Sequence, residues 1–232
     1  MNSKQYIPSI FTLANICCGF MAIAVADIFI GAAFLLVGIL LDFIDGFVAR
    51  RLNAVSQVGK ELDSLADMVS FGLAPAYLYL LIAPSDSWIF WFAPMMFLIG
   101  AALRLAKFNT LPAKAYFVGL PTPFATLFLL GIFIGIQYDK TFYVNSLAIP
   151  LVYYTIPFVL MVLMLSNVKM FSLKSIDQGL AHNKLAVICI SLFLLLLFVD
   201  FRIACSSIVV IYVLLSLLKR NSIENSETQE QP

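Results

Sequence analysis

Charged side chains are scarce in this sequence. Asp, Glu, Lys and Arg together make up 12% of its 232 residues, about half the share that is usual in soluble domains. Hydrophobic residues make up 62%, and the mean hydropathy is +0.99. Too little polar surface remains to cover a water-soluble globule. The composition excludes a soluble fold, argues against intrinsic disorder, and predicts an integral membrane protein in the lipid bilayer.

Strong net charge, histidine clusters and paired cysteines are also missing. The formal net charge is +1, so no basic surface supports a nucleic-acid partner. His182 is the only histidine, and the four cysteines lie in apolar stretches without zinc-site or disulfide spacing. We expect the cysteines to serve as small packing residues.

Long apolar segments make up most of the sequence. A spanning helix needs about 20 mostly apolar residues. The sequence offers eight candidates: 7–26, 28–48, 61–83, 88–106, 121–138, 143–165, 184–199 and 203–218. The last two are short and could form a tight hairpin. We predict an all-α, polytopic bundle of about eight spans, as one domain over residues 1–220 followed by a disordered polar tail over 221–232.

The basic residues predict the orientation of the bundle. Cytoplasmic loops of membrane proteins carry an excess of Lys and Arg. If the N-terminus is cytoplasmic, all of the 14 basic residues except Lys140 and Arg202 fall on the cytoplasmic side. We therefore expect an even number of spans with both termini in the cytoplasm. The alternative is a cleaved signal peptide ending near residues 22–26, which is disfavoured because one lysine alone precedes it.

Acidic residues in or beside the spans are the informative anomaly. Asp42 and Asp45 lie near the end of the second candidate span, and Asp63 and Asp67 lie near the start of the third. A carboxylate within a membrane helix costs roughly 2.5–3.5 kcal/mol even on the mild insertion scale. Spacings of three and four residues put each pair on one helix face. The short connection over residues 50–59 makes the helices neighbours, so the two pairs can converge.

Two explanations of the four carboxylates remain open at this point. Converging carboxylates without a counter-charge would repel one another and take up protons, whereas divalent ions would neutralise them. Hard oxygen ligands favour Mg²⁺ or Mn²⁺ over zinc. Alternatively, the aspartates could pair with Arg50, Arg51 and Lys60 as an ion network, or line a path for protons or cations.

The spacing around these aspartates follows a recognisable pattern. From Asp42 to Asp67 the sequence fits D-x2-D-G-x2-A-R-x8-G-x3-D-x3-D at every fixed position. It resembles the signature of the CDP-alcohol phosphatidyltransferases, membrane enzymes that move a phosphatidyl group from a cytidine-diphosphate lipid to an alcohol. The resemblance implies a helical bundle with a two-metal site.

Further segments are similar to the phosphatidylserine synthase branch of that family. They are Thr12–Gly19, Ser64–Ala76, Ala102–Asn109 and Gly119–Pro123. With them, the resemblance extends over roughly residues 7–125, and we expect the later spans to act as scaffold. It implies CDP-diacylglycerol and L-serine as substrates, a cell (inner) membrane location with the active site facing the cytoplasm, and a homodimer.

The resemblance also implies roles for individual residues. The metal ligands would be Asp42, Asp45, Asp63 and Asp67, and Asp67 would also be the general base. The residues expected to bind the CDP-lipid are Gly46, Arg50, Ser56 and Asn15. Ser56 could equally be an ordinary loop serine, and Asn15 could serve only helix packing.

The acceptor pocket is predicted from the residues themselves. Arg104 and Lys107 lie three apart at the end of the fourth span, so they can face one cavity. A guanidinium binds the carboxylate of L-serine well, and Asn109 could add a hydrogen bond. Both cations could instead be anchors that extend to the membrane surface.

Two competing functions follow from the same residues. Another branch of the family would use glycerol 3-phosphate or an inositol phosphate as acceptor, which adds a phosphate dianion and calls for more cations. A cation or proton transporter would use the aspartates as its path, but it gives no reason for the positions of Gly46, Ala49 and Arg50.

Overall fold

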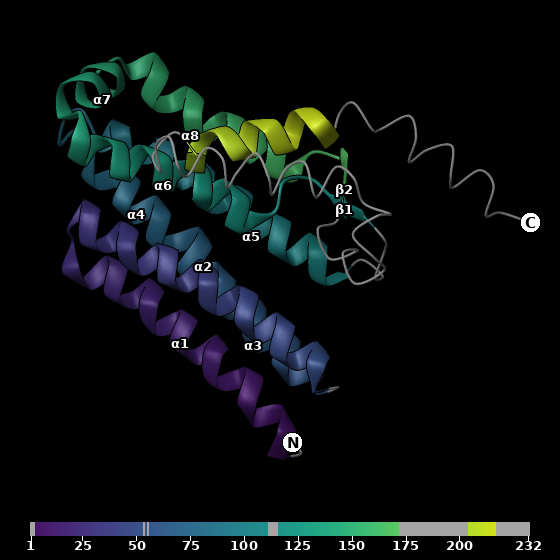
Figure 1. The fold of residues 1–232 in the computed structure, drawn as a ribbon. Coiled ribbons are helices and arrows are strands. Elements are labelled where there is room, and N and C mark those ends of the chain that lie inside the picture. Colours follow the sequence, from purple (N-terminus) through teal and green to yellow (C-terminus); the bar gives the residue numbers. More distant parts are fainter. Residues whose placement is uncertain (1–2, 53, 55, 111–115, 172–203, 217–232) are drawn as a thin grey trace, which may run out of the picture.

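The computed structural model describes residues 3–52, 54, 56–110, 116–171 and 204–216, which are almost entirely helical (Figure 1). The helices are α1 Ser3–Val25, α2 Ile28–Arg51, α3 Gln57–Asp67, η1 Met68–Leu73, α4 Ala74–Leu81, η2 Trp88–Trp91, α5 Phe92–Thr110, α6 Thr122–Tyr138, α7 Lys140–Leu147 and α8 Pro150–Leu165. A further apolar helix covers Ala204–Ser216. Two short strands, β1 Tyr116–Val118 and β2 Lys169–Phe171, pair antiparallel. The predicted helical class is confirmed.

Within the described residues, four helical segments are long and apolar enough to cross a membrane. They are Tyr6–Val25, Ile28–Arg51, Gln57–Leu81 and Trp88–Thr110, which confirms the first four predicted spans. The fifth and eighth predicted spans coincide with the shorter apolar helices Thr122–Tyr138 and Ala204–Ser216. The predicted span over 184–199 and the tail over 221–232 lie outside the described residues, so the count of eight and the orientation stay predictions.

The sixth predicted span, over 143–165, is broken. The segments Thr141–Leu147 and Pro150–Leu165 meet at an angle of 84°. Ile149, between them, is extended with φ −77° and ψ 111°. A proline disfavours the helical conformation of the residue before it, so Pro150 ends one helix and begins the next. The residues of this predicted span therefore form two helices that meet at a sharp bend.

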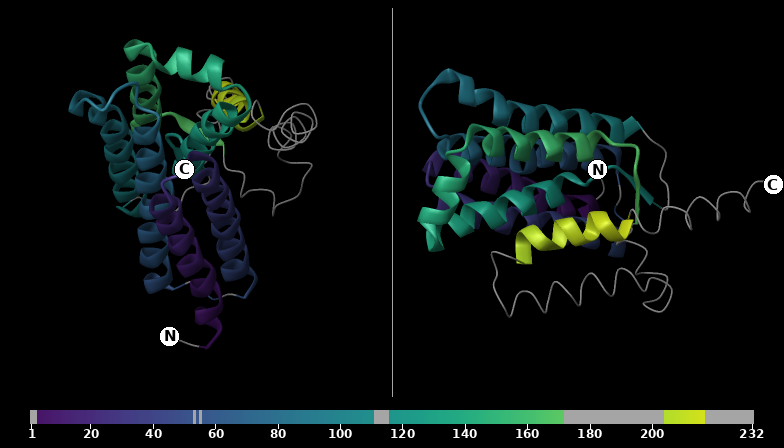
Figure 2. Two further views of the ribbon diagram at one scale, coloured as in Figure 1. Left: turned by 90° about the vertical axis from the view of Figure 1, so that its left-hand side faces the viewer. Right: turned by 90° about the horizontal axis from the view of Figure 1, so that it is seen from above.

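The innermost helix of the described bundle is α6. Its residues 129–136 are buried without interruption, and it contacts α2, η1, α4, α5, α7 and α8. α1 and α2 form a hairpin of neighbouring helices, and α5 packs along α8 (Figures 1 and 2). The Ala204–Ser216 helix lies against α6, where Tyr212 stacks on Phe124 with ring centroids 4.6 Å apart.

The third span contains a π-helical turn, η1. The N–H of Ala74 bonds to the carbonyl of Val69, five residues back. Pro75 follows at once and has no N–H, so the carbonyl of Phe71 cannot receive its α-helical partner. The Thr126 hydroxyl donates to that carbonyl instead, at 3.0 Å. A side chain of the neighbouring helix α6 thus supplies the hydrogen-bond donor that the Phe71 carbonyl lacks within its own helix.

The turn is also joined to α1. Ser70 Oγ donates to the carbonyl of Asn15 at 2.8 Å. An added Cβ on Gly19 would lie 2.6 Å from Ser70 Oγ and 2.8 Å from Ser70 Cα, so only glycine allows α1 to approach this closely. Small residues at helix contacts serve this purpose in membranes.

Gly119 connects the β1–β2 ribbon to α6. Its φ is +74°, in the left-handed region, and an added Cβ would lie 2.4 Å from the carbonyl oxygen of Met164. Its own N–H donates to the carbonyl of Val168, and that of Leu120 donates to the carbonyl of Leu163, each at 3.0 Å. These bonds fasten the start of α6 to the end of α8.

Gly119→Ala should therefore destabilise the protein. The left-handed conformation alone costs a non-glycine residue about 1–3 kcal/mol, and the contact with Met164 adds to it. We expect a clearly lower melting temperature for the purified protein in detergent. Gly46→Ala is the control, because its Cβ would meet Arg50 Nη1 at an ordinary 3.5 Å. An unchanged melting temperature for Gly119→Ala would contradict the geometry of this connection.

Candidate metal centre and active site

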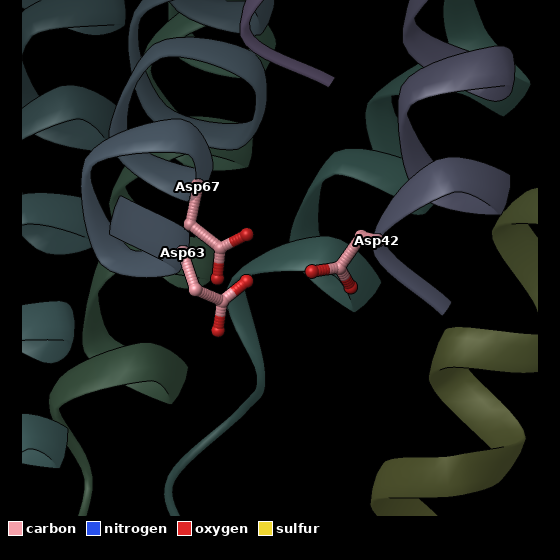
Figure 3. Close-up of side chains that lie close together, drawn as sticks. All are labelled: Asp42, Asp63 and Asp67. Carbon is pink, nitrogen blue, oxygen red and sulfur yellow. The ribbon is translucent and has the colours of Figure 1, made fainter. Parts of the chain in front are cut away.

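Three acidic side chains meet between α2 and α3. Asp42 extends from α2, and Asp63 and Asp67 extend toward it from α3, as Figure 3 shows. One carboxylate oxygen from each lies within 4.8 Å of those of the other two, and all three side chains are half-buried. The four-residue spacing puts Asp63 and Asp67 one turn apart on a single face of α3.

The three carboxylates fit a divalent metal ion. Their oxygen atoms are hard ligands of the kind that Mg²⁺ and Mn²⁺ prefer. Oδ1 of Asp67 is buried and has no hydrogen-bond partner among the described residues, although buried polar atoms normally have one. Carboxylates this close together also repel one another, and a bound cation would remove that repulsion.

Asp45 lies outside this group of three. Its side chain is 5% exposed, and its Oδ2 accepts a hydrogen bond from the Thr12 hydroxyl of α1 at 2.8 Å. The structure therefore brings together three of the four carboxylates expected to converge and places the fourth against α1.

Arg104 is a buried cation whose charge interacts with the cluster. The side chain enters from α5, is 6% exposed, and its charge interacts with that of Asp67. Its Nη1 donates to Thr122 Oγ1 at 2.8 Å, and its Cζ lies 5.8 Å from the ring centroid of Phe108. Its Nε has no hydrogen-bond partner in the described part of the chain. A buried cationic N–H in this state is suited to the carboxylate of a ligand.

Lys107 and Asn109, the other predicted acceptor residues, join neighbouring segments. Lys107 Nζ donates to Asn167 Oδ1 at 2.7 Å, just after α8. The Oδ1 and Nδ2 atoms of Asn109 lie 3.0 and 2.9 Å from Ser64 Oγ, and Ser64 lies in α3 between the two carboxylates. The charge of Arg104 thus interacts with that of Asp67 in the cluster, whereas Asn109 ties α5 to α3, the helix that carries Asp63 and Asp67.

The predicted donor residues surround the connection between α2 and α3. The guanidinium of Arg50 is exposed and folds back beside Gly46, where it is the one described group within 4 Å of an added Cβ. Ser56 is the N-cap of α3, because its Oγ accepts a hydrogen bond from the N–H of Gly59 at 3.0 Å. Ser56 therefore has a structural role here, and its hydroxyl proton can still be donated.

Asn15 is fully enclosed. Its side chain is 0% exposed, and an added Cβ on Gly38 of α2 would lie 3.0 Å from its Oδ1. Neither polar atom of the amide has a hydrogen-bond partner among the described residues. The amide lies between α1 and α2, so it does not face an open surface of the bundle.

A comparison of the sequence with protein families identifies the family of this chain. The profile of the CDP-alcohol phosphatidyltransferases matches residues 5–166. The chain belongs to this family. The match includes every residue of the carboxylate cluster together with Arg104 and Thr122, so the geometry described above is that of a CDP-alcohol phosphatidyltransferase.

Several curated proteins named CDP-diacylglycerol--serine O-phosphatidyltransferase are similar to this chain. The protein from Bacillus subtilis (strain 168) is 42% identical over 131 residues, which are 54% of this chain and 74% of the relative. The one from Methanocaldococcus jannaschii is 38% identical over 136 residues, or 59% of this chain and 63% of the relative. The Helicobacter pylori (strain 26695) protein is 32% identical over 199 residues, which are 83% of each chain.

Sequence reasoning missed two contacts in this phosphatidyltransferase. Thr122 binds Arg104, and Thr12 binds Asp45. Thr122 stands between two prolines in an apolar segment, where a hydroxyl needs a buried partner. Thr12 precedes Asn15 by three residues, which places both on one face of α1. Buried hydroxyls at helical spacing were the available signal, but their partners are distant in sequence.

Asp42→Asn should change stability in opposite directions with and without metal. In excess EDTA, the variant should melt higher than the parent protein, because the substitution removes repulsion within the cluster. In millimolar Mg²⁺ or Mn²⁺, the parent should gain several degrees and the variant much less, because binding to the folded state alone raises the free energy of unfolding.

Asp86→Asn is the matched control, since Asp86 is exposed in the loop before η2. It should melt like the parent in both conditions. Equal responses of Asp42→Asn and the parent to metal would mean that Asp42 is not a ligand.

Proposed function

We propose that this chain transfers the phosphatidyl group of CDP-diacylglycerol to the hydroxyl of L-serine, giving phosphatidylserine and CMP. The observation that carries the proposal is the cluster of three carboxylates together with the buried Arg104, whose charge interacts with that of Asp67. This arrangement pairs a group that can remove a proton with a group that can bind a carboxylate. The relatives support the choice of serine, including the one matched over 83% of both chains.

The cluster supplies the chemistry at the donor phosphate. Asp42, Asp63 and Asp67 would hold a divalent cation, Mg²⁺ or Mn²⁺, because their carboxylate oxygens converge. Asp45, which is hydrogen-bonded to Thr12, stays a predicted ligand outside this group. When bound, such a cation neutralises phosphate oxygens and stabilises the departing CMP. The chain's own contribution is to hold the carboxylates at fixed positions, with Thr12 fixing the Asp45 carboxylate through its hydrogen bond.

Asp67 is the proposed general base. A seryl hydroxyl is a poor nucleophile near neutral pH, and a carboxylate next to it can accept its proton as the oxygen attacks phosphorus. Asp67 is the cluster member whose charge interacts with that of Arg104, the residue proposed to bind the acceptor. We therefore assign the role of base to Asp67. A serine whose carboxylate binds Arg104 would present its hydroxyl on the Asp67 side.

Gly46 and Arg50 are the proposed contacts of the CDP group. The surface above Gly46 meets no described group within 4 Å other than Arg50, which leaves room for a nucleotide to approach the helix. The exposed guanidinium can bind phosphate oxygens through two donors. Ser56 can add one hydrogen bond from its free proton. Asn15 is enclosed between α1 and α2, so its predicted contact with the CDP-lipid stays a prediction.

The proposed location is the cell (inner) membrane, with the active site and both termini on the cytoplasmic side. The distribution of basic residues supports this orientation, because Arg50, Arg51 and Lys60 flank the cluster at one end of α2 and α3. The homodimer implied by the family resemblance stays a prediction.

Incubating purified protein with CDP-diacylglycerol and one labelled alcohol at a time tests the proposal. L-Serine should give phosphatidylserine and CMP, whereas glycerol 3-phosphate and inositol phosphate should give little product. EDTA should abolish CMP release, and Mg²⁺ or Mn²⁺ should restore it. Asp63→Asn should lower turnover by orders of magnitude. A lipid product from another alcohol, or ion flux without CMP, would overturn the assignment.

Arg104→Lys and Arg104→Ala test the acceptor site. Loss of a charge-assisted hydrogen bond corresponds to roughly 1.5–3 kcal/mol, or about 10- to 150-fold in the KM for serine at saturating CDP-lipid. Lys keeps the charge but loses the planar donor pair, so it should lie between Ala and the parent. Arg51→Ala is the control, because Arg51 is exposed at the end of α2. An unchanged KM for serine in Arg104→Ala would remove Arg104 from the acceptor site.

A further inference from the structure

Two buried threonines of α6 make hydrogen bonds to Arg104 and to the turn that follows Asp67. Thr122 and Thr126 are both 0% exposed, and their four-residue spacing places them one turn apart on one face of α6. Thr122 Oγ1 accepts a hydrogen bond from Arg104 at 2.8 Å. The Thr126 hydroxyl donates to the carbonyl of Phe71 at 3.0 Å. One helix face therefore contacts both the acceptor-binding cation and the segment that follows the proposed base.

The hydrogen bond from Thr126 replaces a backbone hydrogen bond that Pro75 cannot make. Phe71 precedes Pro75 by four residues, so its carbonyl lacks the usual N–H partner. A buried carbonyl without a partner loses its solvation in water and gains nothing in return. Thr126 is the hydroxyl that satisfies it, which makes the hydrogen bond specific to this turn rather than an incidental contact.

The π-helical turn that contains the Phe71 carbonyl begins at Met68, the residue after Asp67. η1 covers Met68–Leu73, and the N–H of Ala74 bonds to the carbonyl of Val69, which defines the wide turn. Ser70 of the same turn donates to the carbonyl of Asn15 on α1 at 2.8 Å. η1 is thus fastened to α1 through one hydroxyl and to α6 through another, both within four residues of Asp67. Such a doubly fastened turn fixes the rotation of the helix end that carries Asp67.

We infer that Thr126 is a positioning residue for phosphatidyl transfer: its hydroxyl fixes the π-helical turn after Asp67 and so sets the position of the Asp67 carboxylate. The inference rests on the proposed function, in which Asp67 takes the proton of the acceptor and Arg104 binds it. Thr126 itself touches neither substrate. It acts through the Phe71 carbonyl, while Thr122, one turn earlier, fixes Arg104 from the same helix.

Thr126→Val tests the inference, because valine keeps the shape and removes the donor. We expect kcat to fall by about 10- to 100-fold, the range typical of residues that orient catalytic ligands. The KM for serine should change by less than about threefold, because Arg104 and Thr122 are untouched. Thr126→Ser keeps the hydroxyl and should recover most of the lost turnover. All rates are taken per folded protein, measured by the monodisperse fraction on size exclusion.

Thr155→Val is the matched control. Thr155 is exposed on α8 and donates to the carbonyl of Leu151, four residues back, at 2.6 Å. It therefore loses the same kind of hydroxyl–carbonyl bond far from the cluster, and its kcat should equal that of the parent. A parental kcat for Thr126→Val, or a serine variant as impaired as the valine variant, would overturn the inference.

Pro75→Ala combined with Thr126→Val separates positioning from stability. The new N–H at position 75 can bond to the Phe71 carbonyl, so the double variant should regain the melting temperature that Thr126→Val loses. Its kcat should stay low, because an α-helical turn would replace the π-helical one. If kcat recovers together with the melting temperature, Thr126 merely satisfies a carbonyl and the inference fails.

Failure of the inference about Thr126 can be distinguished from failure of the proposed function by identifying the alcohol that the parent protein uses as acceptor. If the parent transfers the phosphatidyl group to an alcohol other than serine, the same variants are measured with that alcohol. A selective loss of kcat in Thr126→Val would then support the inference although the proposed acceptor was wrong. A normal serine reaction with an unaffected Thr126→Val would overturn the inference alone.

Discussion

Mutual repulsion of three carboxylates in a poorly solvated helical bundle is the constraint on which this structure depends. Asp42, Asp63 and Asp67 place one oxygen each within 4.8 Å of the others, and all three side chains are half-buried. Such charges stay in place only if the backbone that carries them cannot move apart. The close approach of α1 at Gly19, the hydroxyl bonds of Ser70 and Thr126, and the central helix α6 all oppose that movement.

Hydroxyl-to-carbonyl hydrogen bonds are the main means of that restraint. In a bilayer the hydrophobic effect does little to hold helices together, so packing and polar contacts between them carry more of the work. Ser70 joins η1 to α1, Thr126 joins α6 to η1, and Ser206 joins the Ala204–Ser216 helix to the Phe128 carbonyl at 3.2 Å. Each such bond links neighbouring helices without introducing a charge.

The sequence could predict what depends on local spacing, and little that depends on distant partners. Helical periodicity placed Asp63 and Asp67 on one face, and the short connection before α3 brought them to Asp42. Local spacing could not show that the Asp45 side chain turns toward α1, because its partner Thr12 is 33 residues away in the sequence. Hydropathy predicted one span where Pro150 breaks the helix, since an average over a window does not register a single backbone constraint.

The division of the site between helices has a consequence for how acceptor preference can diverge. All three clustered carboxylates, with Gly46 and Arg50, come from the consecutive helices α2 and α3. Arg104 and Thr122 come from α5 and α6, which follow them in the chain. Substitutions in the later helices can therefore alter which alcohol is received while α2 and α3, and the phosphorus chemistry they carry, are inherited intact. The chain is modular in this sense although it forms one bundle.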